Sequence, residues 1–168
     1  PASKQAIEAH LDVFSVFVDE TEGLPLELNG VYQDAPVILE GMLGNINDWY
    51  ANQQTPIVLK GKLNEADLTI EGTAGPLFPQ PAARLDISLQ AENISTFSRF
   101  AGMDLPALTG LDISATSTAS GGQAAVENIK IKLNDPQLTV DLTGDIADLT
   151  NLTGISLKAD IATDQGTA

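Results

Sequence analysis

Apolar and polar residues alternate along most of this chain, which is the pattern of a β-strand with one buried face. The alternation is strict in segments 24–29, 67–72, 84–91, 112–116, 129–133, 138–143 and 155–161, and similar in 35–43 and 56–63. A further run, 9–18, is apolar on both parities and is typical of a strand buried on both faces. The segments predict about ten strands, and their connections are too short for parallel crossovers. We therefore predict an all-β protein built as an antiparallel meander.

Two stretches break the alternation and predict short helical segments. In 45–54, Asn47 is the expected helix cap, because an asparagine side chain accepts hydrogen bonds from the free N–H groups of a first turn. In 93–102, apolar residues recur at helical spacing, with Ser95 as the expected N-cap and Gly102 at the C′ position.

The apolar face of such a sheet must be covered, and two short helical segments are too small to cover it. Trp49, Tyr50, Phe97 and Phe100 lie on these segments, where we expect them to plug the ends of an apolar interior. Three arrangements would cover the rest of a curled sheet: a sandwich or barrel, stacking on other segments of a parent chain, or an open groove that holds an apolar ligand.

Charge excludes one class of partner. Eight Lys and Arg residues stand against 23 Asp and Glu residues, and the formal net charge of −15 repels phosphate backbones, so we expect no nucleic-acid partner. No stretch approaches the roughly 20 apolar residues of a spanning helix, and we expect no membrane span in this segment.

No motif for catalysis, a cofactor or a metal is present in the sequence. His10 has no recognisable nucleophile or metal-ligating partner, and the chain has no cysteine. Asp141, Asp145 and Asp148 lack the spacing of an EF-hand and are expected at solvated strand ends. We therefore expect no enzymatic activity, no cofactor and no metal.

A set of ordered phrases resembles the AsmA family. They are GLPLELNG at 23–30, APVILEG at 35–41, TPIVL at 55–59, ADLTIEGT at 66–73, LDISL at 85–89, AGMDLP at 101–106 and LTGDI at 142–146. The resemblance covers about residues 23–161. It implies a periplasmic, largely β protein anchored to the inner membrane by an N-terminal helix, similar to the bridge-like lipid transfer proteins, in which a hydrophobic trough holds phospholipid.

We therefore expect residues 1–168 to be a single β domain, an interior segment of a longer Gram-negative envelope protein. Its expected function is phospholipid binding or transport in outer-membrane homeostasis. The alternative is a structural or scaffolding module of the periplasm with a self-filled core and no ligand. The residues expected to line a lipid groove are Leu24, Leu26, Leu28, Val37, Leu39, Ile57, Leu59, Leu68, Ile70, Leu85, Ile87, Leu89, Ile113, Ile129, Ile131, Leu138, Val140, Leu142, Ile155 and Leu157.

Overall fold

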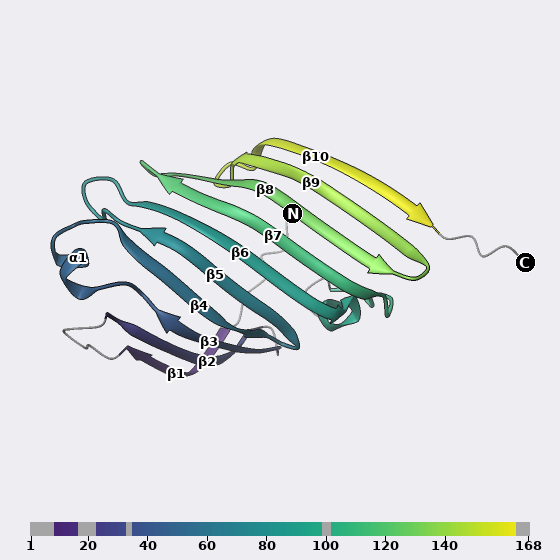
Figure 1. Cartoon of the computed structure of the whole chain (residues 1–168), viewed down its shortest axis with the longest axis horizontal. Coiled ribbons are helices and arrows are strands. Elements are labelled where there is room, and N and C mark those ends of the chain that lie inside the picture. Colours follow the sequence, from purple (N-terminus) through teal and green to yellow (C-terminus); the bar gives the residue numbers. More distant parts are fainter. Residues whose placement is uncertain (1–8, 17–22, 33–34, 99–101, 164–168) are drawn as a thin grey trace, which may run out of the picture.

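A computed structural model describes residues 9–16, 23–32, 35–98 and 102–163, which form one ten-stranded sheet (Figure 1). Each strand pairs antiparallel with the next strand of the chain, so the order across the sheet is the order in sequence. The all-β antiparallel meander predicted from the alternation is confirmed. The strands are β1 (Ala9–Val16), β2 (Pro25–Tyr32), β3 (Ala35–Met42), β4 (Thr55–Leu63), β5 (Ala66–Ala74), β6 (Ala82–Asn93), β7 (Thr109–Ser120), β8 (Gln123–Asp135), β9 (Leu138–Asp148) and β10 (Thr153–Thr163).

The sheet is open, with β1 and β10 at its two edges. In the described part of the chain all strands belong to this one sheet, so of the three expected arrangements the sandwich is not formed. The predicted run 9–18 is a strand as far as Val16. Residues 17 and 18 lie outside the described residues. The expected burial of this strand on both faces stays a prediction.

Cross-strand register places apolar and polar residues on opposite faces of the sheet. Residues directly opposite each other in an antiparallel pair share a face, so the register links side chains into rows. One row on the apolar face runs through Leu28, Leu39, Gly61, Leu68, Leu89, Ile113, Ile131, Leu142 and Ala159. The adjacent row on the polar face runs through Glu27, Glu40, Lys60, Thr69, Ser88, Ser114, Lys130, Thr143 and Lys158.

A β-bulge in β8 keeps its apolar residues in phase with those of β9. The register shifts between Val126 and Ile129, and Asn128 has a φ of 53°, a left-handed conformation that asparagine tolerates. The Asn128 N–H donates a hydrogen bond to Asp145 Oδ1 at 2.8 Å. Val126 and Ile129 are an odd number of positions apart, so in a regular strand they would face opposite sides. The bulge puts both on the apolar face, opposite Ile146 and Gly144.

Both helical segments exist, but their caps differ from those expected. The helix α1 (Ile46–Tyr50) is capped by Asn45, whose side chain accepts a hydrogen bond from the Asn47 N–H at 2.8 Å, so the prediction of Asn47 as the cap was wrong. The 3₁₀ helix η1 (Ile94–Phe97) is likewise capped by Asn93 and not by Ser95. In each case the asparagine precedes the residue that donates to it by two positions.

Gly102 has the conformation expected of a C′ glycine. Its φ is 65°, and the Met103 N–H donates a hydrogen bond to the Ser98 carbonyl at 3.2 Å. Glycine adopts this left-handed conformation without a Cβ penalty. Residues 99–101, which would form the end of the expected helical segment, lie outside the described residues.

The two helical segments cover opposite ends of the apolar face (Figure 1). Trp49 of α1 packs against a buried cluster formed by Leu26, Ile57 and Leu59. Ile94 and Phe97 of η1 pack against a second buried cluster, formed by Ala66, Ala91, Leu111 and Leu133. Tyr50, which we expected in a plugging position, is instead 84% exposed. Phe100 lies outside the described residues.

Aspartates close two of the hairpin turns. Asp135 accepts hydrogen bonds from the backbone N–H groups of Gln137 at 2.9 Å and Thr109 at 3.0 Å, and these bonds lower its pKa. Asp148 accepts hydrogen bonds from the Asn151 side chain at 2.8 Å and from the Asn151 backbone at 3.0 Å, which lower its pKa as well. Because both pKa values are lowered, this stabilisation is present above the unfolded-state pKa and is lost as the pH falls through the folded-state pKa.

Two glycines in the apolar rows allow neighbouring strands to approach closely. Gly41 of β3 and Gly72 of β5 have φ values of 150° and 155°, which residues with a Cβ rarely adopt. A Cβ at Gly41 would collide with the carbonyl oxygen of Val58 on β4, and one at Gly72 with that of Arg84 on β6. The strand spacing on this side of the sheet therefore requires glycine at both positions.

We expect Gly41→Ala to lower the free energy of unfolding by about 2–4 kcal/mol, because the strained φ and the collision with Val58 act together. The matched control is Gly122→Ala in the β7–β8 turn, where φ is 82° but no heavy atom lies within 4 Å of the added Cβ. This control substitution should lower the free energy of unfolding by only about 1 kcal/mol. Urea denaturation followed by far-UV circular dichroism measures both values, and equal losses would contradict the collision.

Candidate functional site

The candidate site is the apolar face of the sheet. The register places the predicted lining residues of β2 to β10 together on this face. Leu24 joins them just before β2, where its backbone exchanges hydrogen bonds with Gly44 and Leu43. The structure thus brings residues from nine strands and one loop onto one continuous surface.

The central part of this surface is covered only in part. Leu68 and Ile87 belong to interior strands of the sheet, yet their side chains are only half-buried. Exposure increases toward β10, where Ile155, Leu157 and Ile161 are 53%, 56% and 68% exposed. Side chains of this type in a sealed core are almost entirely buried. The described residues therefore leave a band of apolar surface that extends from the middle of the sheet to its β10 edge.

Beside α1 the apolar face deepens into a hollow with a volume of about 460 Å³. The hollow is lined by Leu24, Leu43, Ile46, Trp49, Ile57 and Leu77. The Trp49 Nε1–H donates a hydrogen bond to the Leu43 carbonyl at 2.6 Å, which satisfies the only polar atom of the indole. The lining is therefore aliphatic and aromatic, which suits a hydrocarbon chain.

Polar contacts behind the hollow hold its walls in place. Thr55, which is fully buried, accepts a hydrogen bond from the Asn45 N–H at 2.9 Å and so ties the start of α1 to β4. Asn52 Oδ1 accepts hydrogen bonds from the N–H groups of Leu77 at 2.7 Å and Phe78 at 3.0 Å. Because these bonds fix α1 and the β5–β6 loop, the hollow is a feature of the folded chain before any ligand binds.

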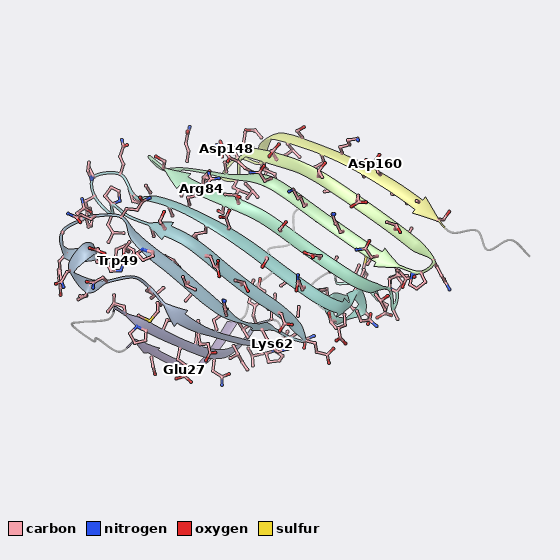
Figure 2. All side chains as sticks on the ribbon, in the orientation of Figure 1. Glu27, Trp49, Lys62, Arg84, Asp148 and Asp160 are labelled. Atoms are coloured by element: carbon pink, nitrogen blue, oxygen red, sulfur yellow. The ribbon has the colours of Figure 1, made fainter. Side chains whose placement is uncertain are left out.

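The opposite face of the sheet is mainly charged and polar (Figure 2), and the exposed Ile38 and Val58 also lie on it. Cross-strand ion pairs join Lys60 to Glu71 at 3.7 Å and Lys62 to Asp67 at 3.0 Å. All four side chains are more than half exposed, so each pair contributes little to stability. Among the residues of β2 to β10, the only charged ones on the apolar side of the register are Asp135 and Asp148, and both lie at hairpin turns.

The apolar face also contains apolar residues that were not among the predicted lining residues. They are Leu63, Leu111, Val126, Leu133, Ile146 and Ile161. Leu133 and Ile161 belong to alternating segments and could have been included from the sequence. Val126 could not, because the bulge at Asn128 changes the phase of the alternation within one strand.

Neither a metal cluster nor a spanning helix is found in the part of the chain that the structure describes. No group of three or more His, Cys, Asp or Glu side chains in these ranges could hold a metal ion. None of the helices within them has both the length and the apolar character needed to cross a bilayer.

Comparisons with protein-family models, with curated proteins and with solved structures gave no match to this chain.

Proposed function

We propose that this chain binds phospholipid, with the acyl chains lying on the apolar face of the sheet. The observation that supports this most directly is the contrast between the two faces. One face is mainly charged and polar, whereas the other is mainly apolar and, among the described residues, is covered only at its ends by α1 and η1. An exposed apolar surface of this extent normally marks a binding site.

The dimensions of the face suit an acyl chain. Neighbouring strands are about 4.8 Å apart, and one acyl chain spans roughly half of the 30 Å hydrocarbon core of a bilayer. A chain lying across the strands would therefore contact about three or four of them. Each methylene removed from water contributes about 0.8 kcal/mol, so even partial cover from the apolar rows stabilises a bound lipid.

The net charge of −15 bears on which head group is accepted. An acidic protein repels anionic head groups over the range of the Debye length, about 8 Å at physiological salt. Zwitterionic phospholipid is therefore the expected ligand, with its head group outside the apolar face and in water.

The resemblance to the AsmA family adds location and context to this proposal. A periplasmic position in a Gram-negative envelope, in a parent protein anchored to the inner membrane, would place the apolar face between two membranes. Other segments of that parent chain are then the expected neighbours of this domain. The chain acts in this proposal as a binding or transport module and not as an enzyme.

The alternative is a structural module whose core is filled by its own side chains. That function would need the apolar face to be sealed, and Ile155, Leu157 and Ile161 are all more than half exposed. The exposed band thus favours the lipid-binding proposal over the structural one.

Trp49 is the only tryptophan of the chain and lines the hollow, so its fluorescence reports directly on a bound acyl chain. We expect zwitterionic phospholipid with brominated acyl chains to quench Trp49, whereas the unbrominated lipid leaves the intensity unchanged. The matched control is Trp49→Phe combined with Thr69→Trp, which moves the indole to the polar face. Equal quenching at both positions, or none at Trp49, would contradict binding at the apolar face.

A second prediction separates lipid binding from folding. Ile87→Asp places a charge in the middle of the half-covered face, and we expect it to weaken lipid binding at least tenfold while lowering the free energy of unfolding by only about 1–3 kcal/mol. Its neighbour Ser88 points to the polar face, so Ser88→Asp should change the stability by less than about 0.5 kcal/mol and leave binding intact.

Lipid titration gives the affinity of the Ile87→Asp and Ser88→Asp variants for lipid, and urea denaturation gives their free energies of unfolding. Complete unfolding of the Ile87→Asp variant would indicate a sealed core and so support the structural alternative. Unaltered lipid binding by that folded variant would show that this part of the face is not the binding surface.

A further inference from the structure

Strand β10 is a long, regular edge strand that contains neither a bulge nor a proline. It spans 11 residues and pairs with β9 from Thr153 to Thr163 without a register shift. Its residues are exposed throughout, and its other side has no neighbouring strand in the described part of the chain. Natural edge strands are usually protected by shortness, bulges, proline or charged side chains. Of these features, β10 has only the charged residues Lys158 and Asp160. The opposite edge, β1, is shorter and has an irregularity between Leu11 and Val13.

The apolar face reaches this edge without cover. Ile155, Leu157 and Ile161 of β10 have strand neighbours on one side only, and each is more than half exposed. One more antiparallel strand would bury their open side and complete the backbone hydrogen bonds of the edge. The edge therefore offers both backbone and apolar contacts to a matching strand.

Charges on the polar face of β10 indicate which strand would match. Lys158 and Asp160 flank Ala159 and lie on the same face, 3.0 Å apart at their charged atoms. Asp160 lies opposite Asp141 of β9, an unfavourable like-charge pair in this chain. Lys158 offsets part of that repulsion within the chain, and a strand that placed a second cation on the open side of Asp160 would offset more of it.

We propose that β10 pairs antiparallel with β10 of a second copy of this chain, about a two-fold axis at Ala159. In this register Lys158 of each copy lies opposite Asp160 of the other, and Leu157 lies opposite Ile161. Two cross-strand ion pairs thus form by symmetry, and each Asp160 lies between Lys158 of its own chain and Lys158 of the other copy. The apolar residues of both copies remain on the same side, as antiparallel pairing requires.

Neighbouring registers lack this complementarity. An axis at Lys158 would place the two lysines opposite each other, and an axis at Asp160 would do the same with two aspartates. An axis at Leu157 would place Asp160 opposite Gly154 and Lys158 opposite Ser156, so no cross-strand ion pair would form. The two-fold at Ala159 is thus favoured by the charge pattern of the strand itself.

Pairing in this way would extend the apolar face across both copies. The row that ends at Leu142 and Ala159 in one chain continues into Ala159 and Leu142 of the next, and the two β1 edges become the ends of one sheet. This interface does not depend on the lipid proposal, but it would double the length of the surface on which lipid could lie.

Sedimentation velocity on the whole chain tests the interface, over roughly 1 µM to 1 mM of protein at physiological salt. We expect a reversible monomer–dimer equilibrium. Lys158→Asp places aspartate opposite aspartate at two symmetric positions and should weaken dimerisation by about tenfold or more. The double variant Lys158→Asp with Asp160→Lys exchanges the charges and should restore it. Lys130→Asp, on the same face but in the interior strand β8, is the matched control and should leave dimerisation unchanged.

A cysteine at the axis tests the register. The chain has no native cysteine, and Ala159→Cys should form an intermolecular disulfide under mild oxidation, because directly opposite Cα atoms lie about 4.5–5.5 Å apart. A monomer at every concentration would overturn the proposal. A dimer that ignores the charge reversal, and whose Ala159→Cys variant forms no intermolecular disulfide, would also overturn it. Growth beyond a dimer would do the same, because it indicates β10-to-β1 pairing.

Discussion

The architecture depends on a single constraint: a one-layer sheet has two faces, and this chain makes one of them apolar without supplying a second layer to cover it. Hydrophobic burial is the dominant favourable term in folding, yet here it is concentrated in two clusters at the ends of the strands. The middle of the face and its β10 side remain half-buried or exposed. The fold and the proposed function therefore rest on the same surface.

Stability must then come from the sheet itself and from the covers at its ends. Antiparallel pairing on both sides satisfies the backbone of the interior strands β2 to β9. Asn45, Asn93, Asp135 and Asp148 accept hydrogen bonds from N–H groups that helix starts and turns leave free. The helix α1 is fixed to buried Thr55, so the apolar hollow beside it does not need a ligand in order to form. Under the lipid-binding proposal, the lipid can therefore leave this surface without unfolding of the chain.

Much of this fold could be predicted from the sequence, because strict alternation in segments such as 84–91 leaves one pairing phase for each strand. Three features could not. The caps lie two residues before the predicted ones, since Asn45 and Asn93 each accept a hydrogen bond from the N–H group two positions later. The bulge at Asn128 reverses the phase within β8. Whether the apolar face is covered is not encoded in the alternation, which is the same for a sandwich and for an open sheet.

The central claim is that the apolar face holds phospholipid, and native mass spectrometry of the chain purified without detergent tests it most directly. Organic extraction of the same sample would identify any lipid that co-purifies. We predict zwitterionic phospholipid bound at a defined stoichiometry, lost on extraction and restored when the lipid is added back. A stable chain that is free of lipid, and that takes up none when lipid is added, would contradict the claim and indicate a structural module.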